Sequence, residues 1–325
     1  MHIDGRRKIA AILKVLDEAE RPLGSTKIAR ALHVIGIDIE QRMVRNYLDS
    51  MDADGLTVNL GRPGRQLTPR GRLELASSMV IDKVGFIDAR ADEMAFRMTL
   101  DLARHTGTVI VNLSTIPAAY LDDARRIMGG VIRARLGMGR FGILSGTADG
   151  VPGLAVASGE AVIGTVCSIT LNGLLRGAGV PVTSRFGGLM EIRDNEPKRF
   201  THVIEYAGTT LDPIEIFIKA RMTSVGEVAR TGAGLVGASF REVPAIALPR
   251  VQKVIRQMDQ AGLGGTVLVG EPSRPVLEIP VDQGRAGLVV TAGLNPLAAV
   301  QEAGITTENR ALARLYDFEA LVPLV

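Results

Sequence analysis

The sequence predicts an α/β protein of the α+β kind, with an N-terminal winged helix-turn-helix followed by a larger, internally duplicated α/β domain of pseudo-two-fold symmetry. Three observations support this prediction. Apolar residues near the N-terminus follow a helical period three times and then an alternation of two. The rest of the chain reads as short aliphatic strands, helices and glycine turns, and several of its blocks recur in the same order. We therefore expect a small domain at residues 1–78 and a larger one at residues 79–325.

Composition limits the class of protein. The 325 residues are enough for two or three domains, and the 46% of apolar residues allow a large core, which is aliphatic because only 4% are aromatic. A single Cys excludes an internal disulfide, and four scattered His argue against a metal site. The charged N-terminus is no signal peptide, and the uncharged stretch 161–175 is too short to cross a bilayer. We expect a soluble cytoplasmic protein with no membrane partner.

Positive charge is concentrated in the first quarter of the chain. Residues 1–72 hold 13 Lys and Arg against 9 Asp and Glu, whereas the other 253 residues hold 25 against 26. The net charge of +3 therefore comes from the small N-terminal domain. This asymmetry indicates a polyanionic partner for that domain alone.

Two helices are predicted at the start of the chain. "RKIAAILKVLDEAE" places apolar residues at helical spacing, namely Ile9, Ile12, Leu13 and Leu16. A second helix is expected in "RPLGSTKIARALHVIG", with Gly24 or Ser25 as its N-cap and Gly36 at its end. Leu23 is expected to pack against Ile28 as a hydrophobic staple.

A third helix is predicted in "DIEQRMVRNYLDSMDADG". Asp38 is expected to cap it, with Gln41 as the reciprocal partner three residues on, and Gly55 to end it. One face forms an apolar stripe, made of Val44, Tyr47, Leu48 and Met51. The opposite face is polar and holds Gln41, Arg42, Arg45, Asn46 and Asp49.

The pattern then changes to an alternation of two, in "LTVNL", a tip "GRPGR" and "QLT". This predicts a β-hairpin whose tip projects Arg62 and Arg65 and is stiffened by Pro63. Three helices and a basic hairpin are typical of a winged helix-turn-helix. Such a domain inserts its third helix into the major groove of double-stranded DNA and lays the wing on the phosphate backbone.

The candidate DNA-binding residues follow from that geometry: Gln41, Arg42, Arg45, Asn46, Arg62 and Arg65. Arg45 and Asn46 have side chains that pair bidentately with guanine and adenine edges, and Arg42 suits either a base or a phosphate. Gln41 is ambiguous, because its capping role would occupy it. The alternative is a winged helix that docks a protein. The basic tip, the basic helix face and the charge asymmetry together favour DNA.

The larger domain contains a duplication. "RMTLDLARHTG" at 97–107 is echoed by "RMTSVGEVARTG" at 221–232, and "GTVCSITLNGLLRGAGV" is echoed by "GLVVTAGLNPLAAVQEAGI". Six matched positions are separated by 123 to 127 residues. We therefore expect two related halves, about 84–195 and 210–310, packed about a pseudo-two-fold axis. The cleft between them is a natural ligand site.

The segment "GTVCSITLNGLLRGAGVPVTSRFGG", residues 164–188, is the candidate effector site. If 165–172 is a strand, one face is mostly apolar and the other carries Ser168, Thr170 and Asn172. The second copy lacks Cys167 and the Thr170 hydroxyl, as expected if only the first copy holds a ligand. Arg185 and the glycines near it suit a carboxylate or phosphate.

The candidate effector-binding residues are Thr165, Cys167, Ser168, Thr170, Asn172, Thr183, Ser184, Arg185, Gly187 and Gly188. The alternative is an ordinary strand, with Arg185 in a structural ion pair. The residues alone leave the two interpretations about even.

Two glycine motifs, "GMGRFG" at 137–142 and "GAGLVG" at 232–237, match the dinucleotide-binding pattern. Each follows a helical stretch and leads into extended chain, which is the reverse of the order that a dinucleotide fold needs. We interpret both as structural turns and expect no catalytic residues and no enzyme. A rival interpretation is an enzyme acting on a small carboxylate or phosphate metabolite, with Glu160, Asp212 or Glu242 as the base. A third treats the chain as a protein-docking scaffold.

The motifs together resemble the NrpR family of nitrogen-regulatory repressors, through nearly the whole chain. The blocks that carry the resemblance are "RNYLDSMDADGLT", "GRPGRQLTPRG", "GTVCSITLNG", "GVPVTSRFGG", "YAGTTLDPIEIFI", "GASFREVPA" and "GLNPLAAVQEAGI". The resemblance implies a winged helix with a single NrpR regulatory domain. It also implies a homodimer or larger oligomer that represses nitrogen-assimilation genes and leaves its DNA operator when 2-oxoglutarate accumulates. It implies no cofactor besides this effector, and DNA binding either alone or with a second NrpR-type protein.

Overall fold

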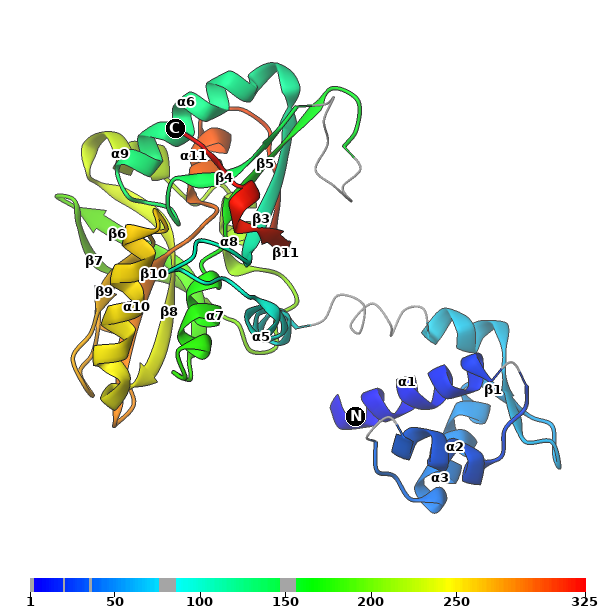
Figure 1. Ribbon diagram of the computed structural model, residues 1–325. Helices are drawn as coiled ribbons and strands as arrows, with labels where there is room; N and C mark the ends of the chain where they lie inside the picture. The colour runs from blue at the N-terminus through cyan, green and yellow to red at the C-terminus, as the bar shows by residue number, and fades with distance from the viewer. Residues whose placement is uncertain (1–2, 20, 35–36, 76–85, 147–155) are drawn as a thin grey trace. The chain divides into compact units, whose positions relative to one another are not determined.

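The computed structural model describes residues 3–19, 21–34, 37–75, 86–146 and 156–325 (Figure 1). The chain divides into two compact units, residues 1–85 and 86–325. The predicted boundary between residues 78 and 79 lies outside the described residues. Each unit is described by itself.

The first unit has three helices followed by a β-hairpin, the order of a winged helix. Its elements are α1 (Ile3–Glu18), α2 (Ser25–Val34), α3 (Gln41–Ala53), β1 (Thr57–Asn59) and β2 (Arg65–Leu67), and residues 69–75 after β2 are helical as well. The strands are antiparallel, and Leu23 pairs with Arg65 to add a one-residue third strand. The apolar stripes predicted from periodicity meet in one core, which includes Ile12, Leu13, Leu16, Leu23, Ile28, Val44, Leu48 and Met51.

The predicted caps of this unit need one correction. Helix α3 begins at Gln41, its N-cap is Glu40, and no side chain bonds to its first N–H groups. Asp38 therefore lies outside the first turn, and the capping box with Gln41 is wrong. The Gln41 amide instead donates to the Ser25 hydroxyl at 3.3 Å. The carbonyl of Gly24 accepts the first N–H bonds of α2, and Gly36 lies outside the described residues.

The second unit is built on two antiparallel five-stranded sheets. One sheet has the order β11-β3-β5-β4-β12 and the other the order β7-β6-β8-β10-β9. The strands of the first are β3 (Thr108–Pro117), β4 (Phe141–Ser145), β5 (Glu160–Val166), β11 (Glu308–Asp317) and β12 (Val322–Pro323). Those of the second are β6 (Thr183–Arg193), β7 (Glu196–Glu205), β8 (Gly234–Pro244), β9 (Thr266–Val269) and β10 (Arg285–Thr291).

Seven α-helices of the described chain pack on these sheets (Figure 1). They are α5 (Ile87–Arg97), α6 (Leu121–Arg133), α7 (Thr170–Gly177), α8 (Pro213–Lys219), α9 (Val225–Thr231), α10 (Leu248–Gln260) and α11 (Asn295–Glu302). Three short 3-10 helices follow β3, β8 and β11, at Ala118–Tyr120, Ala245–Ala247 and Phe318–Ala320. Apolar residues of α6 and α11 pack on the first sheet, and those of α8 and α9 pack on the second. Helices α7 and α10 share one core with strands of both sheets.

The order of elements repeats within this unit, which confirms the internally duplicated α/β fold. Strand β3, helix α6, strands β4 and β5, helix α7 and strand β6 correspond in order to β8, α10, β9, β10, α11 and β11. The two copies exchange their last strands. Strand β6 of the first copy pairs with β8 of the second, and β11 of the second pairs with β3 of the first. Each sheet therefore contains both copies, so that the predicted halves interlock instead of packing as separate bodies.

The predicted strand at 165–172 is wrong beyond Val166. Strand β5 ends at that residue, the chain turns through Cys167–Ile169, and α7 begins at Thr170. The N–H of Thr170 donates to the carbonyl of Cys167, and the Thr170 hydroxyl bonds to backbone groups of Ile110. These bonds end the strand, so Ser168, Thr170 and Asn172 do not share one strand face.

Candidate nucleic-acid interface and effector cavity

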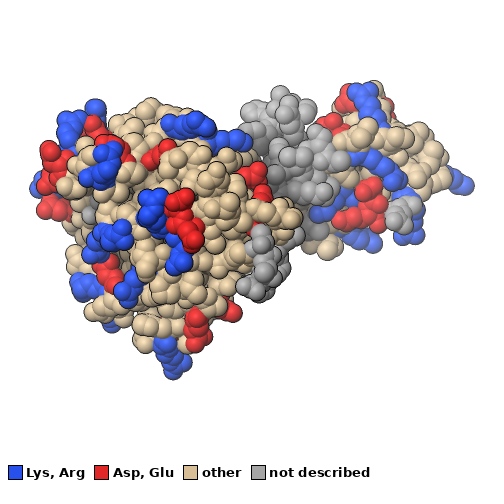
Figure 2. Space-filling model, turned by 90° about the horizontal axis from the view of Figure 1, so that it is seen from above, with Lys and Arg blue, Asp and Glu red and all other residues tan. Residues whose placement is uncertain are grey.

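The outer face of α3 is polar and exposed. Gln41, Arg42, Arg45 and Asn46 are exposed, whereas Val44, Leu48 and Met51, on the opposite face, are buried. No carboxylate of the described residues forms an ion pair with Arg42 or Arg45. On the visible face of the second unit, basic and acidic side chains lie side by side (Figure 2), in keeping with ion pairs such as Arg126–Asp123 and Arg199–Glu191. The α3 guanidinium groups are thus free to meet an anionic partner.

The wing places one of its two predicted arginines at the tip. Arg62 is exposed and also has no carboxylate partner among the described residues. The N–H of Gly61 donates to the Asn59 side chain at 2.9 Å and so closes the turn. A Cβ on Gly64 would lie 2.3 Å from the backbone of Leu23, so only glycine allows the wing to pack this closely.

The expectation that Arg65 projects from the tip is wrong. Its side chain is 15% exposed and forms ion pairs with Asp49 and, through Nε at 3.0 Å, with Asp52. Both carboxylates belong to α3. Asp52 also accepts a hydrogen bond from the Thr57 hydroxyl. Arg65 therefore fastens the wing to α3, and this contact between distant segments leaves no signal in the local sequence.

Two of the ten predicted effector residues, Cys167 and Ser168, line a small cavity in the second unit. The other lining side chains include Tyr206, Asp212 and Ser239. The segment 292–294, which precedes α11 and corresponds to 167–169 of the first copy, closes it from the other side. The cavity volume is about 20 Å³, room for about one water molecule.

The other predicted effector residues do not line this cavity, and they are occupied elsewhere. The Thr165 hydroxyl bonds to Asn112, and the Thr170 hydroxyl bonds to Ile110. The Asn172 amide donates to Ser184, and Arg285 donates to Thr183. Gly187 and Gly188 lie in β6 where neighbours pack closely: a Cβ would be 2.9 Å from Pro213 and 2.4 Å from the His202 carbonyl, respectively. The prediction that all these groups share one cavity is wrong.

Arg185 is also displaced from its predicted role. Its Nη1 lies 2.7 Å from the carboxylate of Glu242 and donates to the Pro280 carbonyl at 2.8 Å. Glu242 is buried and pairs with Arg285 as well, at 3.1 Å. The structure thus shows the alternative arrangement, a structural ion pair. It also leaves Glu242, one of the three carboxylates considered for an enzyme, between two guanidinium groups.

The guanidinium that bonds to the cavity-lining Ser168 and Ser239 belongs to Arg241, which is not one of the predicted effector residues. Arg241 is fully buried in β8. Nη1 donates to the Ser168 carbonyl and Nη2 to the Ser168 hydroxyl, both at 2.8 Å, and Nη2 also reaches the Ser239 hydroxyl. Its Nε has no partner, and no carboxylate of the described residues pairs with it. A buried cation without a counter-ion costs free energy, so this site is suited to an anion.

Only the duplication hinted at Arg241. Arg241 pairs across β8 and β10 with Leu288, and Ser114 pairs with Ile163 at the corresponding place in the first copy. One copy has a guanidinium where the other has a hydroxyl. The signal was therefore the adjacent charges Arg241 and Glu242 within the second-copy strand "GLVGASFREVP", where the first-copy strand "TVIVNLSTIP" has no charged residue.

Burial shifts the pKa values of Cys167, Asp212 and Arg241. Burial raises the pKa of the Cys167 thiol to about 12, so the group stays a neutral thiol near pH 7. Burial also raises the pKa of Asp212 to about 6, although its carboxylate accepts N–H bonds from Ile214 and Glu215. The pKa of Arg241 is lowered by the same desolvation. With a neutral thiol, Cys167 is not an activated nucleophile.

No group of three or more metal-ligating side chains occurs among the described residues. Among the described helices, none combines the length and the hydropathy that a bilayer crossing requires. The two glycine motifs each lie between a helix and a strand, as predicted: the first joins α6 to β4 and the second joins α9 to β8.

Residues 84–322 match the family of NrpR regulatory domains NRD1 and 2, and residues 10–75 match the ribonuclease R winged-helix domain. The global nitrogen regulator NrpRI of Methanosarcina mazei is 33% identical over 97% of both chains. The global nitrogen regulator NrpR of Methanococcus maripaludis is 29% identical over 95% of this chain, which spans 54% of that protein. The fold is also similar to the crystal structure of a nitrogen repressor-like protein from Methanococcus jannaschii, with a TM-score of 0.63. The two sequences are 26% identical, and the match covers 74% of this chain and 99% of that chain.

Proposed function

The chain belongs to the NrpR family of nitrogen regulators, as its motifs predict, and from this membership we propose that it is a DNA-binding transcriptional repressor. We propose further that it represses nitrogen-assimilation genes in the cytoplasm as a homodimer or larger oligomer, and that a small organic acid such as 2-oxoglutarate releases it from DNA. It uses no other cofactor, and it acts alone or with a second NrpR-type protein.

The DNA-binding part of this proposal is supported by arginines of α3 and the wing that pair with no carboxylate of the described residues. Arg42 and Arg45 project from the polar face of α3, opposite its buried stripe, and Arg62 projects from the wing tip. A winged helix presents these two surfaces to the major groove and to the phosphate backbone, respectively. Arg45 and Asn46 read base edges, and Arg62 contributes charge without sequence preference.

The effector half is supported by the unpaired Nε of Arg241. A carboxylate of the organic acid replaces the missing counter-ion of this guanidinium and accepts from the Ser168 hydroxyl beside it. The closed cavity of about 20 Å³ is too small for a dicarboxylate, so binding requires the segments 167–169 and 292–294 to move apart. The effector therefore favours a packing of the two interlocked copies that differs from the closed one. Because coupling between two sites is reciprocal, effector and DNA weaken each other's binding.

The test is a gel shift with operator DNA, taken from upstream of the gene encoding this chain or of nitrogen-assimilation genes beside it. Wild-type protein binds the operator, and millimolar 2-oxoglutarate weakens binding. Arg45→Ala lowers operator affinity by about 1–3 kcal/mol and leaves binding to unrelated DNA unchanged. Arg97→Ala, an exposed arginine on α5, is the matched control. Operator affinity that no small dicarboxylate alters would remove the effector half, and full operator preference in Arg45→Ala would remove α3 as the reader.

A further inference from the structure

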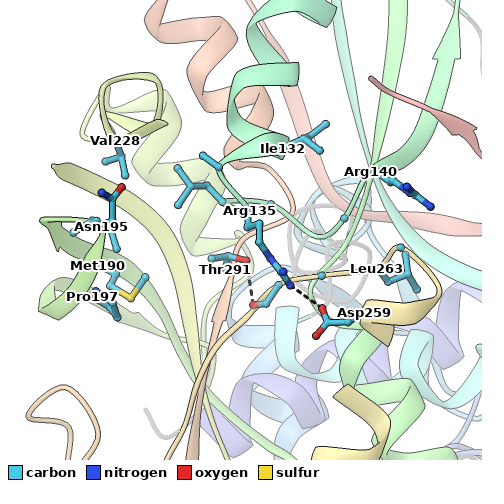
Figure 3. A pocket seen from close by; sticks show the side chains of 18 residues that line it. Ile132, Arg135, Arg140, Met190, Asn195, Pro197, Val228, Asp259, Leu263 and Thr291 are labelled. Carbon is cyan, nitrogen blue, oxygen red and sulfur yellow. Dashed lines mark hydrogen bonds and ion pairs between the residues drawn. The ribbon is translucent and has the colours of Figure 1, made fainter. Parts of the chain in front are cut away.

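A second, larger cavity lies in the regulatory unit, with a volume of about 590 Å³ (Figure 3). This volume is in the range typical of small-molecule sites. Both copies of the duplication form its walls: the end of α6 and the turn before β4 come from the first, and the end of α10 and the turn before β9 come from the second. None of its lining residues belongs to the α3 face, to the wing or to the small cavity lined by Cys167 and Ser168.

One wall of this cavity is apolar and the centre is charged. Met190 and Pro197 lie on one side, and Arg135 extends between the walls toward Asp259 (Figure 3). Ile192 also lines the cavity and follows Met190 by two residues in β6, so the two side chains lie on the same face of that strand. Arg140 adds a second cation at the edge, with its guanidinium 5.1 Å from the centre of the Phe141 ring. Two arginines and one aspartate give the lining a net positive charge. The cavity is therefore suited to a molecule with an anionic group and an apolar body.

The Arg135 guanidinium is available to such a ligand. Its Nη2 lies 3.1 Å from Asp259, but the two side chains are 78% and 45% exposed. An exposed pair of this kind contributes little to stability, so a ligand oxyanion can compete with it. The bidentate geometry of a guanidinium suits both carboxylate and phosphate.

The backbone turns sharply at several points around the cavity. Arg135 and Asn195 both have left-handed backbones, with φ of 59° and 61°, a conformation that is rare outside glycine. Gly139 has a φ of 101°, and a Cβ there would lie 2.4 Å from the Gly262 carbonyl. The "GMGRFG" motif is thus the place where the turns of the two copies meet, and it forms part of the cavity lining.

We propose that this cavity is a second ligand site, for a small organic anion whose carboxylate or phosphate pairs with Arg135 and whose apolar body lies on the wall formed by Met190, Ile192 and Pro197. The segment 291–295 connects this cavity to the small cavity lined by Cys167 and Ser168. Thr291 lines the larger cavity, while the next three residues line the smaller one. Asn295 then donates to the Leu136 carbonyl at 2.8 Å, in the wall of the larger cavity. A ligand there shifts the segment 291–295 and so changes effector affinity; this coupling, unlike the site itself, rests on the proposed function.

Isothermal titration calorimetry on the full chain with phenyl phosphate, which joins one phosphate to one apolar ring, tests the site. We expect binding at millimolar concentration, about tenfold tighter than for inorganic phosphate, which lacks the apolar body. Arg135→Ala weakens phenyl phosphate binding about tenfold. Arg126→Ala leaves it unchanged; Arg126 is likewise an exposed, Asp-paired arginine, on α6 but outside the cavity. Asn195→Asp adds a carboxylate without removing volume and also weakens binding, which guards against a folding defect in Arg135→Ala.

Three results would overturn the proposal: no binding of phenyl phosphate, binding that neither variant weakens, or loss of 2-oxoglutarate binding in Arg135→Ala but not in Arg241→Met. The last would make the larger cavity the effector site itself. A titration of 2-oxoglutarate with and without saturating phenyl phosphate measures the coupling, and an unchanged affinity would remove it. Failure of 2-oxoglutarate to bind at all would count against the proposed function, while the phenyl phosphate result would stand separately.

Discussion

The arginines of α3 and Arg241, which bonds to two serines in the lining of the small cavity, occupy opposite environments. Arg42 and Arg45 are exposed, and water solvates them at almost no cost in free energy. Arg241 is fully buried, has no carboxylate partner among the described residues and keeps one N–H without a partner. The exposed charges can bind DNA without any change in fold. The buried charge is held in an unfavourable state that an anion would relieve, so binding there is coupled to a change in packing.

Because of this contrast, the proposed DNA-binding and effector-binding sites contribute to binding in different ways. A surface arginine supplies affinity that depends on salt and changes little with conformation. A buried arginine supplies a difference in free energy between two conformations, and only such a difference allows a ligand to shift an equilibrium. Because β6 and β11 each pair with a strand of the other copy, separating the copies at one point disturbs both sheets. The difference in free energy between the two conformations therefore involves the whole second unit.

The largest effect is expected from removing the buried charge. Arg241→Met keeps most of the side-chain volume but removes the group proposed to hold the effector carboxylate. We expect 2-oxoglutarate affinity to fall about a hundredfold, which corresponds to about 2.7 kcal/mol. The free energy of unfolding should change little, because removing an uncompensated buried charge offsets the loss of its hydrogen bonds to Ser168 and Ser239.

Calorimetry gives the affinity and urea unfolding gives the stability of this variant. Arg250→Met, which alters an exposed arginine of α10 in the same unit, serves as the control and should change neither. Undiminished 2-oxoglutarate affinity in Arg241→Met would break the comparison, because the buried charge would then have no role in ligand binding. A large loss of stability would contradict the view that Arg241 is held at a cost.

A second, smaller effect concerns Asp212, which lies in the same cavity. Burial raises its pKa to about 6, from 3.8 for an exposed aspartate. The folded state therefore binds a proton more readily than the unfolded state. As the pH falls from 7.5 toward 4.5, this residue loses its desolvated charge and its contribution to stability rises, the reverse of an ordinary paired carboxylate.

Asp212→Asn should remove this pH dependence. Asparagine keeps the side-chain oxygen that accepts N–H bonds from Ile214 and Glu215. We expect the variant to match the wild type in stability near pH 4.5 and to exceed it by on the order of 2 kcal/mol near pH 7.5. Urea unfolding across this range measures the difference. A difference that does not vary with pH would show that Asp212 is ionised in the folded protein even at the lower pH.

Features that form a pattern in the sequence could be predicted from it, and features that depend on contacts between distant segments could not. The three helices and the wing follow from spacing within short segments, the duplication follows from blocks that recur 123 to 127 residues apart, and the structure contains all of them. Arg65 was misplaced because its partners, Asp49 and Asp52, come from another element. Arg241 pairs with Ser184, the neighbour of Arg185, across β8 and β6, and only the pairing of these distant strands decides that Arg241 reaches Ser168 in the cavity lining. The sequence contained both guanidinium groups, but their environments depend on contacts between distant segments.

The smallest effect separates the two arginines of the wing. Arg62→Ala removes one exposed charge at the tip, so we expect affinity for all DNA to fall about equally and the salt dependence to decrease by about one charge. Arg65→Ala instead leaves Asp49 and Asp52 without their cation and detaches the wing from α3. It should lower the free energy of unfolding of the first unit by about 1–3 kcal/mol. Gel shifts at several salt concentrations and thermal unfolding measure the two quantities. If Arg65→Ala changed only the salt dependence and left stability intact, Arg65 would contact DNA as its sequence position suggested, and the wing would need another anchor.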